Sequence, residues 1–244
     1  ENFHDMQGIC HIVLQEHSYL KPGMFVVGGD SHSQTGGAVG CFMFGVGATD
    51  MAAVLATGET WLQVPETLGV RWHGQLGLGV CAKDMMLKAC AVLGVGGATN
   101  RVVEFVGPTI ESLPHVERMT LCNMTAELGA QTGIISPDQI TAKYLRSIGT
   151  VFDELTDWRS DPDATFDEIL EFDASDLQPL VAVPHSPANT TPVNNIDTTK
   201  VHQAYIGACT GAKLNDLHMA AAVLHGHRVA KGVRLLLAAG VCAS

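Results

Sequence analysis

Short apolar runs alternate along this chain with longer segments in which apolar residues recur every three to four positions. Runs bounded by Gly or Pro predict buried strands, and the longer periodic segments predict helices. The predicted strands are 24–27, 69–72, 102–106, 201–206 and 233–239. The predicted helices are 49–62, 82–93, 118–129, 137–147 and 214–224. This alternation of strands and helices predicts a protein of the α/β class.

Two stretches depart from this pattern. Residues 151–178 hold ten acidic side chains and a single cation, Arg159, so we interpret them as a solvated connecting face. A calcium-binding loop is disfavoured there, because the acids lack the alternate spacing and the glycine that such a loop needs. Residues 182–199 contain three prolines and several Asn and Thr, which predicts an extended linker.

Composition narrows the class of protein. The 244 residues suffice for one large or two to three modest domains, and 46% hydrophobic residues with 26 glycines suit an α/β protein with many close turns. A net charge of −11 without a basic stripe argues against nucleic acid or an anionic membrane as partner. The seven cysteines form no regular disulfide framework, and no apolar run approaches the ~20 residues of a membrane span. We therefore expect a cytoplasmic protein.

Cys209 lies in Tyr-Ile-Gly-Ala-Cys-Thr-Gly-Ala-Lys (205–213), after the predicted strand 201–206. A tight turn is predicted at 207–211, followed by the helix 214–224. A thiol near a helix N-terminus is favoured as the thiolate by the positive end of the helix dipole. This placement suits a nucleophile or a metal ligand. The alternative is a small apolar side chain that fills a turn.

Asp30, Ser31 and His32 directly follow the predicted strand 24–27 and a pair of glycines. Ligands of open α/β sheets bind beyond the carboxyl ends of strands. The three residues therefore suit a general acid or base, its orienting carboxylate, and a hydroxyl for a substrate carboxylate. The alternative is a structural turn in which Asp30 and Ser31 accept hydrogen bonds from backbone amides.

Three further polar residues occupy otherwise apolar elements. His11 lies in the apolar run 9–14, where a core histidine is the alternative to a catalytic one. Asn123 and Glu127 are four residues apart on the predicted helix 118–129 and therefore share a face. A carboxylate buried there needs a partner or a site to serve, and the alternative is that this face is exposed to solvent.

The sequence lacks the motifs of nucleotide-binding proteins and of serine hydrolases. Gly45-Val46-Gly47 precedes a predicted helix, but the third glycine and the acidic residue of a dinucleotide-binding fingerprint are not in place. The chain has no Gly-Lys-Ser/Thr phosphate loop. Ser31 and Ser33 do not lie in the Gly-x-Ser-x-Gly elbow of a serine hydrolase.

Five segments carry a resemblance to a known family. They are Gly-Ile-Cys-His (8–11), Gly-Gly-Asp-Ser-His-Ser-Gln-Thr-Gly-Gly (28–37), Phe-Gly-Val-Gly-Ala-Thr-Asp-Met-Ala (44–52), Arg-Met-Thr-Leu-Cys-Asn-Met-Thr-Ala-Glu (118–127) and Gly-Ala-Cys-Thr (207–210). Together they resemble the aconitase family, most of all the large subunit of 3-isopropylmalate dehydratase and its homoaconitase-like relatives. The resemblance runs in order over essentially the whole chain.

The resemblance implies three-layer α/β/α domains that are incomplete at both ends of this chain. Residues 1–63 would be the C-terminal part of a first α/β domain, and residues 64–148 a second. Residues 149–244 would form an acidic connector, a linker and the start of a third α/β domain that carries Cys209. The chain begins at Glu1 rather than at methionine, which also leads us to expect a piece of a longer polypeptide.

The resemblance further implies an iron–sulfur hydro-lyase that moves a hydroxyl between neighbouring carbons of a 2- or 3-hydroxy diacid, most simply 2-isopropylmalate in leucine biosynthesis. Such enzymes hold a [4Fe–4S] cluster by three cysteines and leave one iron open as a Lewis acid. Cys209 matches the first of these cysteines. His11 and His32 match the family's acid–base histidines, and Asp30 matches their carboxylate. Asn123 and Glu127 match the pair near the iron-bound oxygen, and Ser31 matches the substrate-side hydroxyl.

Parts of the family pattern lie outside this chain. The other two cluster cysteines are expected beyond Ser244, and an upstream Asp-His pair is expected before Glu1. The serine base and the substrate arginines are expected downstream or on a separate small swivelling subunit that would complete a heterodimer. Gly211 stands where relatives usually have Asn. The alternatives are a homoaconitase, a dimethylmalate-type dehydratase, or a cluster-free relative that serves as a binding or regulatory module. We expect the fragment alone to be inactive.

Overall fold

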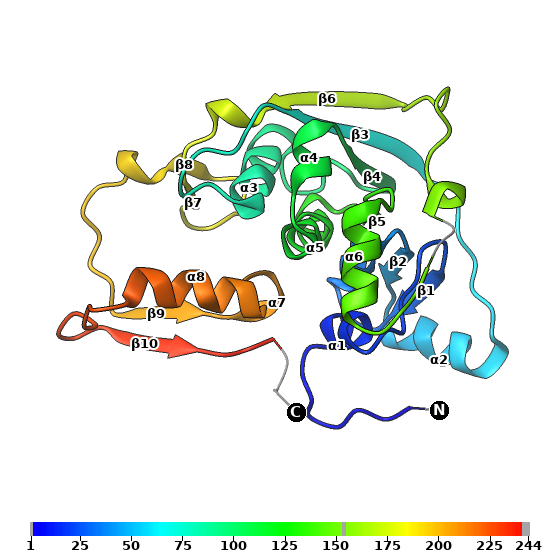
Figure 1. The fold of residues 1–244 in the computed structure, drawn as a ribbon, viewed down its shortest axis with the longest axis horizontal. Coiled ribbons are helices and arrows are strands. Elements are labelled where there is room, and N and C mark those ends of the chain that lie inside the picture. Colours follow the sequence, from blue (N-terminus) through cyan, green and yellow to red (C-terminus); the bar gives the residue numbers. More distant parts are fainter. Residues whose placement is uncertain (1, 153–154, 241–244) are drawn as a thin grey trace.

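The computed structural model describes residues 2–152 and 155–240. Its main sheet is parallel, with the strand order β5-β4-β3-β6 (Figure 1). The strands are β3 (Glu66–His73), β4 (Arg101–Val106), β5 (Thr132–Ile134) and β6 (Glu168–Asp173). Leu68, Val70 and Trp72 alternate along β3 and are all buried, because successive side chains of a strand point to opposite faces.

Three helices pack against the face of the sheet that carries Leu68, Val70 and Trp72. They are α3 (Ala82–Leu93), α4 (Pro108–Ser112) and α5 (His115–Asn123), and α5 continues directly into the 3-10 helix η2 (Met124–Leu128). Met85 of α3 and Leu121 of α5 are fully buried in this core. The main core therefore holds in place the helix that carries Asn123.

The opposite face of the sheet is bounded by an irregular segment that precedes β6. The Ser160 hydroxyl donates to the carboxylate of Glu104 on β4 at 2.8 and 2.9 Å. The ring of Phe166 lies over Gly69 of β3. The 3-10 helices η3 (Leu155–Trp158) and η4 (Ala174–Asp176) flank this region.

A second, two-stranded parallel sheet forms the N-terminal part. It pairs β1 (Phe25–Gly28) with β2 (Phe42–Gly45), and the helices around it are α1 (Cys10–Glu16), η1 (Ser33–Val39), α2 (Ala48–Thr57) and α6 (Gln139–Ser147). All of η1 is buried against α5, β2 and β5. A Cβ added at Gly37 would overlap the carbonyl oxygen of Gly133, so glycine is needed for this close approach. The tight packing of η1 positions the loop that precedes it.

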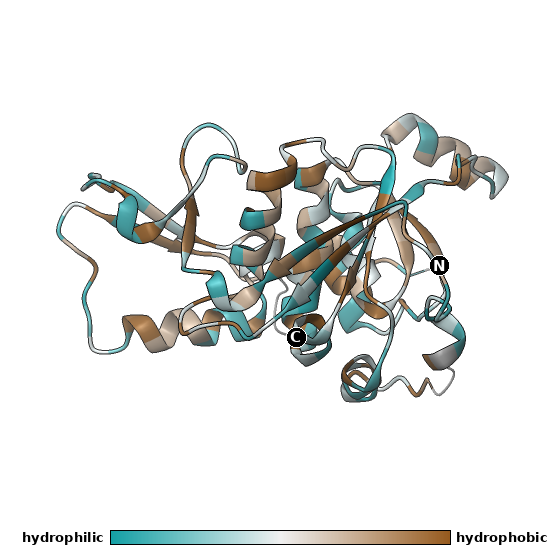
Figure 2. Ribbon diagram, turned by 90° about the horizontal axis from the view of Figure 1, so that it is seen from above, coloured by the Kyte–Doolittle hydropathy of each residue, from teal (hydrophilic) through white to brown (hydrophobic). Residues whose placement is uncertain are grey.

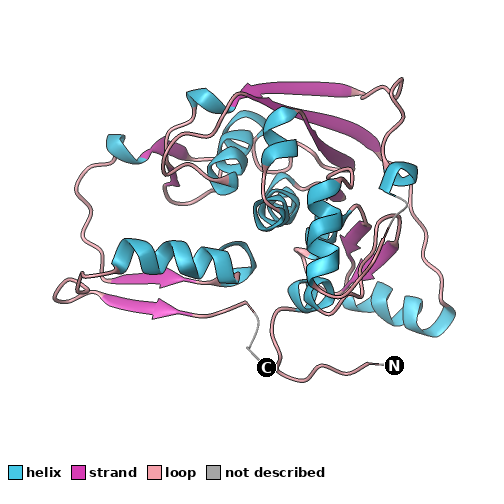
Figure 3. Cartoon of the chain, viewed as in Figure 1, coloured by secondary structure: helices cyan, strands magenta, loops and turns pink. Residues whose placement is uncertain are grey.

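The C-terminal part is a small parallel pair with its own helices (Figure 3). Its elements are β9 (Gln203–Ile206), α7 (Ala208–Gly211), α8 (Leu214–Leu224) and β10 (Arg234–Leu237). α7 lies beside α5, and the backbone of Ile9 donates to the carbonyl of Gly240 at 2.8 Å. On α8, Leu214 and Val223 are exposed, and the hydropathy colouring of the ribbon shows apolar residues along this helix (Figure 2).

The structure confirms the α/β class, and it confirms several elements closely. α3 and α8 have the predicted bounds, and β4 and β10 differ from prediction by a few residues. The helix predicted at 49–62 ends at Thr57, because Gly58 adopts a left-handed conformation (φ 73°) and stops it. The helix predicted at 118–129 starts earlier, at His115, and its last turn tightens into η2.

Other predictions were wrong. The acidic stretch 151–178 is not only a connecting face, because β6 within it pairs with β3 at the edge of the main sheet; Asp153 and Glu154 lie outside the described residues. The stretch 182–199 is not simply an extended linker. It contains most of the antiparallel hairpin of β7 (Leu180–Ala182) and β8 (Thr190–Pro192), followed by the 3-10 helix η5 (Val193–Asn195). No helix within the described residues combines the length and apolar character of a membrane-spanning segment.

Candidate active site

The loop after β1 brings five of the predicted site residues together. Oδ1 of Asp30 lies 3.2 Å from Nδ1 of His11 on α1 and also accepts from the backbone amide of His32 at 2.8 Å. The Ser31 hydroxyl lies 3.0 Å from Nδ1 of His32. Nε2 of His32 reaches Oε1 of Glu127 on η2 at 3.4 Å. Residues that are 95 positions apart in sequence therefore meet at the carboxyl end of β1.

The same loop is also a structural turn. The Ser33 hydroxyl donates to the carbonyl of Asp30 at 2.7 Å, and the Thr35 hydroxyl donates to the carbonyl of His32 at 2.6 Å. The two interpretations of this motif are compatible, because its backbone bonds fix the turn while the side chains of Asp30 and His32 reach across to α1 and η2.

His11 is a buried, neutral imidazole. Burial lowers its pKa to about 4, and this effect exceeds the opposite effect of the neighbouring Asp30 carboxylate. A neutral ring that donates from Nδ1 to Asp30 keeps a lone pair on Nε2. That Nε2 is buried and has no hydrogen-bond partner among the described residues. Because buried polar atoms are nearly always paired, the site suits a bound polar group that supplies the partner.

Asn123 is held by a buried chain of hydrogen bonds. Its Nδ2 donates to the Thr35 hydroxyl at 2.9 Å, and Gln15 donates to the Thr35 carbonyl at 2.8 Å. Oε1 of Gln15 lies 3.2 Å from Nε2 of His115, whose pKa burial lowers to about 3. Oδ1 of Asn123 is buried without a partner among the described residues. The alternative that this face is exposed to solvent is therefore wrong for Asn123.

Glu127 differs from Asn123 in its environment. The end of α5 tightens into η2 between them, and the Glu127 side chain is 37% exposed, whereas Asn123 is completely buried. Glu127 therefore pairs with His32 at the opening of the site, and Asn123 lies inside it.

Cys209 is the second residue of α7 and packs partly against the main core. The predicted tight turn 207–211 is therefore a single short helical turn. Lys213 holds it, because its buried Nζ donates to the Thr210 carbonyl at 2.8 Å and to the Thr120 hydroxyl on α5 at 3.1 Å. Burial raises the pKa of Cys10, and the charges of Asp30 and, more weakly, of Cys209 act in the same direction. Cys209 thus lies close enough to Cys10 to influence the ionisation of its thiol.

Sequence reasoning did not single out Cys10, Gln15, Thr35 or His115 as members of this group. Thr35 and Cys10 lie within the segments that carried the family resemblance, and Cys10 adjoins His11. Gln15 and His115 carried no signal, because their contacts join α1 to α5 across 100 positions of sequence.

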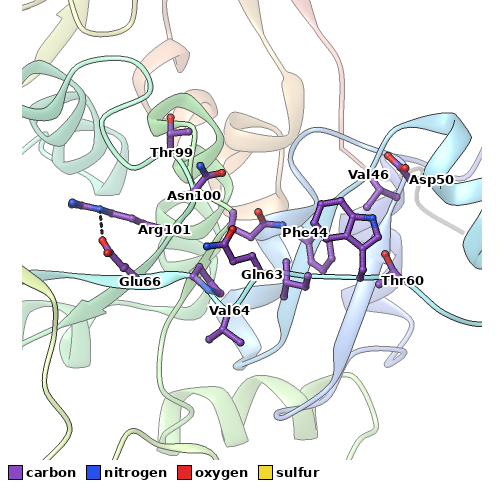
Figure 4. A pocket seen from close by; sticks show the side chains of 14 residues that line it. Phe44, Val46, Asp50, Thr60, Gln63, Val64, Glu66, Thr99, Asn100 and Arg101 are labelled. Carbon is purple, nitrogen blue, oxygen red and sulfur yellow. Dashed lines mark ion pairs between the residues drawn. The ribbon is translucent and has the colours of Figure 1, made fainter.

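A cavity of about 470 Å³ lies elsewhere, near the ends of β2, β3 and β4 (Figure 4). Arg101 at its edge is already paired with Glu66 at 3.6 Å and with Glu168 at 2.6 Å. No unpartnered buried polar side chain lines this cavity within the described part of the chain. We therefore place the candidate active site at the loop after β1, where His11 and Asn123 have unpaired atoms.

The chain is similar over nearly all of its length to known proteins. A family model described as aconitase family (aconitate hydratase) matches residues 1–242. The chain is 44% identical over 239 residues to a protein named 3-isopropylmalate dehydratase large subunit 1 from Methanopyrus kandleri, which covers 97% of this chain and 56% of that protein. It is 45% identical over 229 residues to a probable methanogen homoaconitase large subunit from Methanosarcina mazei, and this match covers 93% of this chain and 58% of that protein. The chain spans about half the length of the curated relatives it matches.

Proposed function

The chain belongs to the aconitase family, and from this premise we propose that it is part of the large subunit of an iron–sulfur hydro-lyase. The reaction is the removal of water from a 2- or 3-hydroxy diacid and its addition at the neighbouring carbon. The name of the Methanopyrus kandleri relative supports 2-isopropylmalate as the substrate. The name of the Methanosarcina mazei relative supports a homoaconitase activity as the alternative.

The observation that carries this proposal is the pair of unpartnered buried atoms, Nε2 of His11 and Oδ1 of Asn123, beside the hydrogen-bonded loop after β1. One is a lone pair on a neutral ring and the other is an amide oxygen. Both accept hydrogen bonds, so they fit a hydroxyl group or a water molecule. A site for a hydroxylated substrate needs such acceptors.

The donor set also fits an iron–sulfur cluster. Cys209 would be one cluster ligand, and the other cysteines would come from the part of the protein outside this chain. When bound, a cluster with one iron free of cysteine supplies a Lewis acid for the hydroxyl and a carboxylate of the substrate. Lys213 supports this assignment, because it fixes the turn that carries Cys209 against α5.

Residues of this chain orient the substrate and transfer one of the protons. Because the pKa of His11 is about 4, this ring is neutral near pH 7 and acts as a hydrogen-bond acceptor that Asp30 orients. We assign to His32 the transfer of a proton from Nε2 to the departing hydroxyl, which leaves as water. Glu127 lies 3.4 Å from that nitrogen and fixes the orientation of the ring. The proton on the neighbouring carbon is removed by a base outside this chain.

Ser31 and Asn123 bind the substrate and do not transfer protons. The Ser31 hydroxyl lies 3.0 Å from His32 and is suited to donate to a substrate carboxylate. Asn123 presents its free oxygen to the hydroxyl that moves. We further propose that a separate small subunit closes the site, a proposal supported by the relatives' names, which describe large subunits.

The experiment is anaerobic reconstitution of the full-length protein with iron and sulfide, followed by absorbance and EPR. Cys209→Ser should abolish the cluster signals. Cys81→Ser is the matched control, because Cys81 is the N-cap of α3, a position where serine is a preferred residue. A cluster that persists in Cys209→Ser would disprove its ligand role. A folded wild-type protein that takes up no cluster would favour a cluster-free binding module instead.

A further inference from the structure

Cys10 has no role in the proposed hydro-lyase reaction, yet its sulfur faces two residues that do. Sγ of Cys10 lies 3.9 Å from Nδ1 of His11, and that nitrogen lies 3.2 Å from Oδ1 of Asp30. The thiol, the imidazole and the carboxylate each have a ligand atom within 4.8 Å of the other two. No other group of three such residues occurs in the described part of the chain.

The spacing of these atoms is close to that of a tetrahedral site. Zn²⁺ binds thiolate sulfur at about 2.3 Å and imidazole nitrogen at about 2.0–2.1 Å, so tetrahedral angles place neighbouring ligand atoms roughly 3.3–3.6 Å apart. The separations from Nδ1 of His11, 3.9 Å to Sγ of Cys10 and 3.2 Å to Oδ1 of Asp30, bracket this range. Small side-chain shifts would bring the sulfur and the carboxylate oxygen to the separations from Nδ1 that a shared Zn²⁺ ion requires.

The surroundings suit ligand binding from solvent. His11 is buried and fixed on α1, and Asp30 is held by the backbone amide of His32 while its side chain stays 41% exposed. Cys10 is the first residue of α1 and is exposed. Ligation through Nδ1 moves the ring proton to Nε2, which has no existing hydrogen bond among the described residues to lose.

We propose that Cys10, His11 and Asp30 form a site for a single divalent cation of the Zn²⁺ class. One sulfur, one nitrogen and one oxygen ligand favour a borderline-soft ion over Mg²⁺ or Ca²⁺, which take oxygen ligands. Three protein ligands leave a fourth position for water. An ion bound there occupies His11 and Asp30, so it competes with the hydroxylated substrate. This site is distinct from the cluster site, because it uses Cys10 and needs no cysteine outside this chain.

Titration of the metal-free full-length protein with Co²⁺, purified without cluster reconstitution, tests the proposal. Co²⁺ reports its ligands directly, through a thiolate-to-cobalt charge-transfer band and through visible bands whose intensity distinguishes tetrahedral from octahedral coordination. The wild type should show both signals, and Zn²⁺ should displace the Co²⁺. Cys10→Ser should lose the charge-transfer band, and Asp30→Asn should weaken binding by about 100-fold or more.

Cys209→Ser is the matched control, because it removes the neighbouring thiol and leaves all three proposed ligands. It should keep both cobalt signals. A charge-transfer band that survives in Cys10→Ser, a band that disappears in Cys209→Ser, or only weak octahedral bands in the wild type would each overturn the proposal. These readouts involve neither the cluster nor turnover, so their result is independent of the proposed hydro-lyase function.

Discussion

Arg118 provides a quantitative test of how the fold supports the site. Its guanidinium is completely buried and makes two hydrogen bonds to the carboxylate of Asp138, from Nη1 at 2.8 Å and from Nη2 at 2.6 Å. It also donates to the carbonyls of Leu113 at 3.1 Å and Glu111 at 3.0 Å. Asp138 is in turn the N-cap of α6. This one side chain therefore joins α5, which carries Asn123, to α4 and α6.

Arg118→Met keeps most of the side-chain volume and removes every one of these hydrogen bonds. Loss of one partner from a buried ion pair costs about 3–5 kcal/mol, because the Asp138 carboxylate, only 20% exposed, keeps its two backbone hydrogen bonds but loses its countercharge. In a domain of this size each kcal/mol shifts the melting temperature by about 2–4 °C, so we expect a decrease of roughly 6–20 °C. Urea unfolding and thermal melts followed by circular dichroism measure both quantities.

Arg71→Met is the matched control for this prediction. Arg71 makes a single ion pair with Glu171 at 2.9 Å, with both side chains about half exposed, so its loss should cost less than about 1 kcal/mol. If Arg118→Met and Arg71→Met lowered the free energy of unfolding by the same small amount, our account of the buried pair would be refuted.

The pair should also depend on pH in a defined direction. Burial alone would raise the pKa of Asp138, but its hydrogen bonds with Arg118 and with backbone amides outweigh burial and hold the pKa below its usual range. A depressed pKa contributes stability above the unfolded value of about 3.9 and loses it as the pH falls through the folded value. The stability difference between wild type and Arg118→Met should therefore be constant near neutral pH and shrink below about pH 4.

The other predictions concern the site and its supports. His32→Ala should lower turnover by about 10²–10⁴-fold and leave cluster absorbance unchanged, and unchanged turnover would remove His32 from the mechanism. Lys213→Met should reduce iron bound per chain, because it removes the shorter of two hydrogen bonds to the Thr210 carbonyl and loosens the turn of Cys209. Full iron occupancy would contradict that supporting role. Gly37→Ala should destabilise the protein by about 1–3 kcal/mol or more in urea unfolding, because the new Cβ meets the Gly133 carbonyl, and wild-type stability would show that η1 can move away from β5.

Much of the local structure was predictable from the chain alone. The helices 82–93 and 214–224 were predicted at their observed bounds, because their apolar spacing is regular and each is bounded by turn-forming residues. The segment 28–37 was predicted to hold site residues, because polar side chains after a strand end are otherwise hard to explain. The resemblance carried by five ordered segments predicted the family, which the match over residues 1–242 confirms.

Elements that depend on distant partners were not predictable in this way. β6 lies in an acidic stretch, and only its pairing with β3 makes it a strand. β2 and β5 were not predicted, and each is short and packed against η1. Edge strands and short strands carry little intrinsic signal, because their stability comes from neighbours supplied by other parts of the chain.

The sequence by itself determined the α/β class, the family and the residue types available for chemistry, because these follow from local periodicity and short motifs. Only the tertiary structure decided which side chains meet. It brought Glu127 to His32, left Nε2 of His11 and Oδ1 of Asn123 without partners, and turned Cys10 toward Asp30. The physical reason is that hydrogen bonding and burial act over a few ångströms in space, whatever the separation of the residues along the chain.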